Sequence, residues 1–70
     1  MTDYTFTMNH DLGDVTMTQF TKICTFLNGQ FGSTEDESFT LNKASAKPSL
    51  KSVNNAFAQQ GLTYTCVSVT

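Results

Sequence analysis

The stretch that decides the fold is VTMTQFTKICTFLNG, residues 15–29. Thr16 and Gln19, three residues apart, match a capping box, in which each side chain binds the backbone of the other residue. Val15 and Phe20 flank this cap at the spacing of a hydrophobic staple. The sequence therefore predicts a helix that begins just after Thr16.

Apolar side chains recur along this helix at steps of three and four residues, which places them on one face. Asn28 and Gly29 follow as a C-terminal stop, because both residue types accept a positive φ. We expect one amphipathic helix over residues 17–28. Its apolar stripe comprises Phe20, Ile23, Cys24 and Leu27, and the same spacing extends to Phe31.

Two short segments show the two-residue period of a half-buried strand. Residues 4–8 alternate apolar and polar side chains throughout, and residues 38–42 do so around Phe39 and Leu41. Residues 29–38 are rich in Gly, Ser, Thr and acids, which is typical of a solvated loop. We therefore expect two strands in the first 42 residues, separated by the first helix and this loop.

A second helix and a last strand are predicted in the remaining sequence. Pro48 is tolerated in the first turn of a helix and Gly61 supplies a stop, so we expect a helix over residues 48–60. Residues 62–69 are rich in β-branched and aromatic side chains, which predicts a strand, and apolar side chains on both faces favour either a central position or partial cover of both faces. The expected fold is one α+β domain, residues 1–70, in βαβαβ order, with both helices packed on one face of a three-stranded sheet.

The composition fits a small folded domain. Seventy residues suffice for one domain with a thin core, and six Phe, two Tyr and a net charge of −2 argue against intrinsic disorder. No apolar run approaches the ~20 residues of a membrane span, and the residues after Met1 lack the pattern of a signal peptide. We expect a cytoplasmic protein with no cofactor, no metal and no membrane partner.

Charge is segregated along the chain. All six acidic residues lie in the first 37 positions, whereas three of the four lysines lie in positions 43–51. The chain has no arginine and a pI near 4.9, which disfavours nucleic acid as a partner, because proteins that bind it carry a basic patch. Glu35, Asp36 and Glu37 form the densest cluster of charge, and a basic surface of a protein partner would attract them.

Few residues have side chains suited to catalysis or metal binding. Cys24 lies on the apolar stripe and Cys66 in the last strand, which favours two packed, reduced thiols over a disulfide or a zinc site. His10 with Asp11 or Asp14 offers an acid/base pair or cation ligands. The simpler interpretation of that segment is a turn in which Asp and Asn side chains bind backbone groups.

In size and composition the chain resembles small accessory proteins of bacteriophages, since it is short, acidic and rich in Thr, Ser and Asn. The resemblance implies a viral, non-catalytic protein that binds and inhibits or modulates a host or defence protein in the host cytoplasm. We expect Glu35, Asp36 and Glu37 to contact that protein, with the aromatic ring of Phe31 as an anchor. Two alternatives stay open: a homodimer or larger homo-oligomer formed through the edge of the last strand, and a small enzyme that uses His10.

Overall fold

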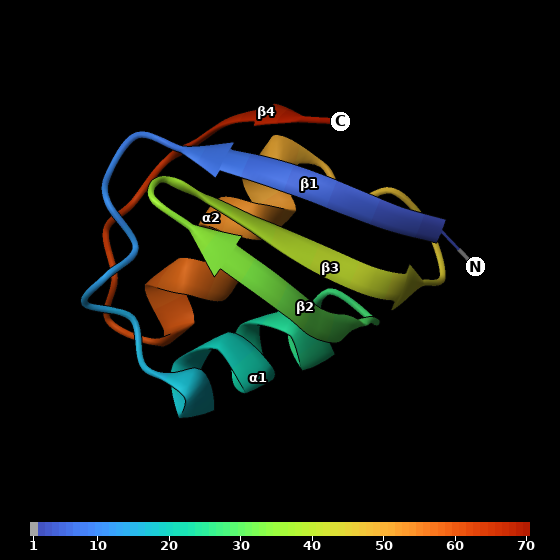
Figure 1. Ribbon diagram of the computed structural model, residues 1–70, viewed down its shortest axis with the longest axis horizontal. Coiled ribbons are helices and arrows are strands. Elements are labelled where there is room, and N and C mark those ends of the chain that lie inside the picture. Colours follow the sequence, from blue (N-terminus) through green and yellow to red (C-terminus); the bar gives the residue numbers. More distant parts are fainter. Residues whose placement is uncertain (1) are drawn as a thin grey trace.

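The computed structural model describes residues 2–70, which form two helices and one four-stranded sheet (Figure 1). The expectation of a single α+β architecture is confirmed, but three strands in βαβαβ order is wrong, because part of the expected loop forms a fourth strand. Within residues 2–70, neither helix is long and apolar enough to cross a bilayer. The elements are β1 Thr2–Met8, α1 Met17–Phe26, β2 Gln30–Glu35, β3 Ser38–Ala44, α2 Leu50–Gln59 and β4 Cys66–Val69.

The strands lie in the order β2-β3-β1-β4, and every neighbouring pair is antiparallel. β1 and β2 therefore run in the same direction on either side of β3, and α1 connects them. β3 and β4 are related in the same way across β1, with α2 as their connection. Two split βαβ units thus interleave in one sheet, as in the ferredoxin-like arrangement. Because one fold hosts many functions, the function must be sought in the surface.

Both helices pack on one face of the sheet, around Phe39 of β3 (Figure 1). The Phe39 side chain is 1% exposed. Its ring centroid lies 4.9 Å from that of Phe6 on β1, 5.7 Å from Phe20 on α1 and 5.6 Å from Phe57 on α2. One aromatic cluster therefore joins the two central strands to both helices. The opposite face of the sheet is open and polar, with Thr5, Thr7, Ser38 and Thr40 paired across β1 and β3.

The α1 helix begins where the sequence predicts. The Thr16 hydroxyl accepts a hydrogen bond from the Gln19 N–H at 3.1 Å, and the Gln19 side chain accepts one from the Thr16 N–H at 2.9 Å. The helix ends at Phe26, two residues before the predicted boundary, because Leu27 is the C-cap and Asn28 turns the chain with a φ of 61°. The capping box is confirmed, and the stop is local to Asn28 as predicted.

The α2 helix begins two residues later than predicted. Ser49 is its N-cap, and the Ser49 hydroxyl accepts a hydrogen bond from the Ser52 N–H at 3.1 Å, so Leu50 is the first helical residue. Pro48 lies outside the first turn because Ser49 supplies the cap. Gly61 follows the helix with a φ of 76°, a conformation that glycine adopts without strain, as the predicted stop requires.

Residues 29–38, expected in a loop, contain the edge strand β2. Phe31 is the one residue of β2 that packs against the core, so no two-residue period marks the strand in the sequence. β2 is held by its pairing with β3, to which the Ser33 N–H adds a hydrogen bond to the Thr40 hydroxyl at 2.7 Å. The loop prediction is wrong because the partner strand, rather than the pattern of β2 itself, fixes the extended conformation.

Residues 62–69, expected as one central strand, divide into an irregular segment and the short strand β4. β4 pairs with β1 alone and lies at the edge of the sheet. Two side chains bind the backbone at the boundary between the irregular segment and β4. The Asn9 Oδ1 accepts a hydrogen bond from the Thr65 N–H at 2.9 Å, and the Asn54 Oδ1 accepts one from the Cys66 N–H at 2.7 Å. The central position is wrong because apolar side chains of the irregular segment reach the core without forming a strand.

Candidate binding surface at the acidic end

Folding brings the two acidic segments of the sequence together at one end of the molecule. One segment is the turn between β2 and β3, and the other is the loop between β1 and α1, both on the left in Figure 1. All the acidic side chains of these segments are exposed. This surface, called the acidic end below, carries Asp11, Asp14, Glu35, Asp36 and Glu37, which are five of the six acidic residues.

Backbone hydrogen bonds hold the two segments in place. The Leu12 N–H donates to the Asp36 carbonyl oxygen at 2.9 Å, and the Met8 N–H donates to the Glu37 carbonyl oxygen at 2.7 Å. The Leu12 side chain is 2% exposed and belongs to the core, so it anchors the loop from below. The carboxylates are therefore displayed on an ordered backbone, which reduces the conformational entropy lost on binding.

The turn itself is a two-residue hairpin loop, Asp36-Glu37. Asp36 has a φ of 51°, a region that Asp and Asn accept more readily than most residues. The Ser38 hydroxyl donates to the Glu35 carbonyl oxygen at 3.0 Å across the turn. The three acidic residues chosen from the sequence thus occupy the tip of a hairpin.

A shallow recess of about 190 Å³ lies between the loop and the hairpin. Carboxylate-bearing residues from both segments line this recess. Carboxylates form charge-assisted hydrogen bonds with ammonium and guanidinium groups, so the recess suits a Lys or Arg side chain. Within residues 2–70, no group of three or more His, Cys, Asp or Glu side chains has the arrangement of a metal site. The acidic residues that line the recess are Asp11, Glu35 and Asp36.

Phe31, the fourth residue expected at the partner surface, lies apart from the acidic tip. It pairs with Leu41 near the start of β2, and its ring stacks on Phe20 at a centroid distance of 4.7 Å. The ring is half-buried rather than exposed. Folding therefore adds Asp11 and Asp14 to the predicted acidic cluster and separates Phe31 from it. Nothing local in the sequence relates the two acidic segments, because their contact depends on how β1 pairs with β3.

His10 is engaged by neighbours other than the carboxylates. Its ring stacks on Tyr64, with centroids 4.3 Å apart and planes 9° from parallel, and its Nδ1 lies 2.7 Å from the Asp11 carbonyl oxygen. The Asp11 carboxylate accepts a hydrogen bond from the Gly13 N–H at 2.6 Å. The simpler interpretation of this segment, a turn held by Asp and Asn side chains, is confirmed at Asp11 and at Asn9.

Cys24 and Cys66 are buried free thiols, as the sequence predicts. Burial raises the pKa of Cys24 to about 12 and also raises the pKa of Cys66. Because the thiolate is the nucleophile, neither residue is activated for covalent chemistry at neutral pH.

The end of β3 and the connection to α2, which hold Lys43 and Lys47, lie at the opposite end of the sheet, on the right in Figure 1. Lys43 occupies a bulge with a φ of 55°, and its N–H donates to the Asp3 carboxylate at 3.0 Å. Lys47 precedes α2, and Lys51 lies in its first turn. Lys43 and Lys47 are therefore separated in space from the five carboxylates of the acidic end, whereas Asp3 lies beside Lys43.

The acidic end thus differs from the rest of the surface in chemistry and in geometry. Exposed carboxylates from two segments surround one recess, whereas the open face of the sheet carries hydroxyl groups and the far end carries lysines. No protein-family model, no curated protein and no solved structure matches the chain.

Proposed function

We propose that the chain is a non-catalytic protein-interaction module that binds a basic surface of a partner protein through the acidic end. By covering that surface it inhibits or modulates the partner, as the resemblance to bacteriophage accessory proteins implies. The observation that supports this proposal is the convergence of five exposed acidic residues from two segments on one ordered backbone. Complementary charge across an interface raises the association rate and fixes the orientation of the partners.

The recess gives this surface a specific contact. A Lys or Arg side chain of the partner that enters it meets carboxylate-bearing residues of both segments, Asp11 from the loop and Glu35 from the hairpin. Asp14 and Glu37 are exposed and follow the lining residues Gly13 and Asp36 in the sequence, so they add to the attraction at longer range. Because this attraction acts between exposed charges, raising the salt concentration should weaken the complex.

The test is a pull-down in which the tagged chain and a charge-reversed variant capture proteins from a cytosolic extract, read by mass spectrometry. The variant combines Glu35→Lys and Glu37→Lys with Asp36→Asn, because Asn accepts the φ of 51° at that position. We expect a stoichiometric partner on the unmodified chain and at least a tenfold weaker complex with the variant, about 1.4 kcal/mol.

A control variant adds positive charge elsewhere, through Thr25→Lys and Asn55→Lys at exposed positions of α1 and α2. This control should retain the partner, since it leaves the acidic end intact. A partner captured equally well by the charge-reversed variant would show that the acidic end is not its binding site.

A further inference from the structure

A second surface, separate from the acidic end, follows the free edge of β4. Thr5 and Thr70 exchange both backbone hydrogen bonds, at 2.8 and 2.9 Å, and the adjacent Val69 opposes Phe6. Hydrogen-bonded and non-hydrogen-bonded positions alternate in an antiparallel pair, so the N–H and C=O of Val69 point away from β1. Since no strand within residues 2–70 pairs with β4 on that side, β4 keeps a backbone donor and acceptor for another strand.

A groove of about 400 Å³ lies beside this edge, between β4 and the start of α2. Pro48, Leu50 and Val69 give it an apolar lining. Leu50 is 43% exposed, and Val67 on β4 is 55% exposed; they are two of the four large apolar residues left exposed within residues 2–70. Free backbone groups beside apolar contact area are what strand addition by an extended peptide requires.

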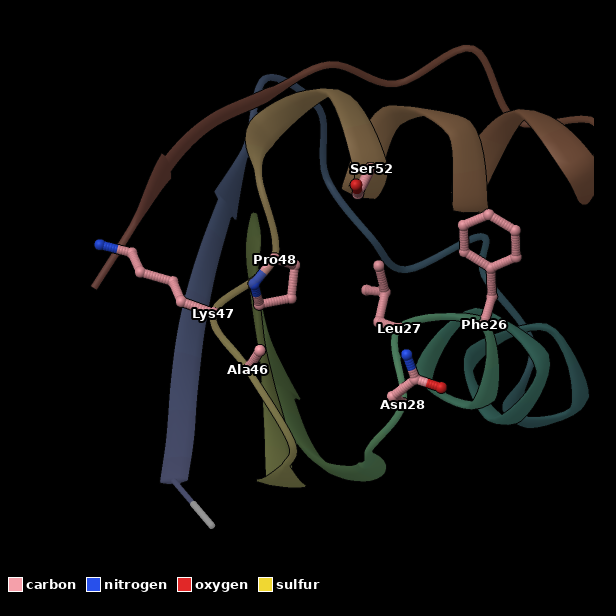
Figure 2. Close-up of a pocket in the computed structure, with 7 residues that line it drawn as sticks. All are labelled: Phe26, Leu27, Asn28, Ala46, Lys47, Pro48 and Ser52. Carbon is pink, nitrogen blue, oxygen red and sulfur yellow. The ribbon is translucent and has the colours of Figure 1, made fainter.

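Among residues 2–70, Lys47 has the one charged side chain that lines the groove. Figure 2 shows this side chain extending toward β4, while Pro48 turns toward a smaller pocket of about 150 Å³ beside Phe26. Ser49, the N-cap of α2, also lines the groove, so the positive end of the helix dipole lies there. Within the described residues no acidic side chain lines it, and an occupant that carries a carboxylate is therefore favoured.

We propose that the free edge of β4 binds an extended, acidic segment of a partner protein by β-strand addition. The backbone of the segment pairs with Val69, an apolar side chain enters the groove beside Leu50, and a neighbouring carboxylate meets Lys47. A second copy of the chain matches less well, because its β4 edge brings another Lys47 instead of a carboxylate, and like charges that face each other across paired strands repel. The site is independent of the acidic end, so the two proposals fail separately.

The test uses the isotope-labelled full chain and a blocked peptide, Glu-Val-Thr-Val-Thr-Val-Glu, with a matched peptide in which Lys replaces both Glu. We expect the acidic peptide to shift the amide signals of Leu50, Val67 and Val69, and the lysine peptide to bind at least about tenfold more weakly. Equal binding of the two peptides, or shifts that leave these amides unchanged, would overturn the proposal.

Three variants locate the site. Lys47→Glu should weaken the acidic peptide at least about tenfold, whereas Lys22→Glu, a reversal at an exposed position of α1, should not. Val69→Pro removes the outward N–H without breaking a bond to β1 and should also abolish binding. If Val69→Pro does not fold, Lys47→Glu decides, and a Lys47→Glu variant that binds normally overturns the proposal.

The chain alone provides the last control. Concentration-dependent shifts of the β4 amides together with a doubled mass in solution would show that a second copy occupies the edge and would overturn the peptide proposal. The variant that combines Glu35→Lys, Asp36→Asn and Glu37→Lys should bind the acidic peptide no more weakly than the unmodified chain, because it leaves Lys47, Leu50 and Val69 of the groove intact.

Discussion

β2 and β4 close the sheet on its two sides, yet they are held in opposite ways. β2 depends on pairing with β3 and on a single half-buried ring, Phe31, which stacks on Phe20 of α1. β4 is shorter, but two features of Cys66 fix the start of the strand. The Cys66 side chain is buried in the core, and the backbone N–H of Cys66 donates a hydrogen bond to the Asn54 side chain. The comparison teaches that a strand can be specified by its partner strand as fully as by its own apolar pattern.

The two edges also differ in how open they are to another strand. The β2 edge is interrupted by a bulge between Phe31 and Thr34 and ends in the acidic turn, and both features oppose edge-to-edge pairing. Glycine is favoured at position 32 in this bulge, because a Cβ there would lie 2.7 Å from the Asn42 Oδ1, which is closer than a Cβ normally approaches another atom. β4 also has a register shift, at Val67 between Cys66 and Ser68, but it carries no acidic residue, and the Val67 side chain is exposed. The guarded edge therefore presents charge, whereas the open edge presents backbone and apolar groups.

The largest expected effect tests whether one ring holds β2. Phe31→Ala removes a half-buried side chain and should destabilise the β2 region by about 2 kcal/mol, less than the 3–5 kcal/mol of a fully buried Phe. Amide hydrogen exchange should accelerate along β2, while the amides of β4 that bond to β1 keep their protection.

The matched change on the other edge is Val67→Ala, at a side chain that is already exposed. It should change the free energy of unfolding by no more than about 0.5 kcal/mol. If Phe31→Ala accelerates exchange equally in every strand, β2 belongs to the global folding unit and the contrast between the edges fails.

The same contrast explains what the sequence could predict. The capping box at Thr16 and the stops at Asn28 and Gly61 depend on neighbours within a few residues, so they were right to within two residues. The strand around Phe39 was right because one face of it is buried. Nearly every residue of β2 is exposed. An apolar pattern in the sequence indicates which residues are buried, not which strands pair, so the pattern does not predict β2.

The residues of the acidic end could likewise be predicted only in part from the sequence. Charge density alone identified Glu35, Asp36 and Glu37, because they are consecutive in the sequence. Asp11 joins them through the backbone bond between Leu12 and Asp36, which exists only when β1 and β3 pair in this register. No local signal carries that information.

An intermediate effect is expected from pH, because Cys24 on α1 is buried beneath the sheet. Its pKa rises from 9.0 in the unfolded chain to about 12 in the fold. Above pH 9 the unfolded chain releases this proton and the native chain keeps it, so the free energy of unfolding should fall as pH rises, by about 1.4 kcal/mol at pH 10. Urea unfolding at pH 8 and pH 10 measures the difference.

Cys24→Ala is the control for this titration. The variant has a lower stability at pH 8, because it leaves a small cavity, but most of the loss between pH 8 and pH 10 should disappear. A residual loss is expected from Cys66, whose pKa burial also raises. An undiminished loss in Cys24→Ala would show that another group controls the alkaline transition.

The smallest effect concerns the acidic tip of the β2 hairpin. Asp36 holds a φ of 51°, which is unfavourable for an L-residue and free of strain for glycine, so Asp36→Gly should stabilise the hairpin by about 0.5 kcal/mol after the entropy of the added glycine is counted. Asp36→Asn removes the same charge and keeps a side chain that tolerates this φ, so it should leave the thermal midpoint nearly unchanged. Both variants should weaken the proposed partner complex equally, since each removes one carboxylate from the recess. A loss of stability in both variants would instead mean that the Asp36 carboxylate stabilises the turn. The acidic residue at the tip would then be explained by folding and not by binding.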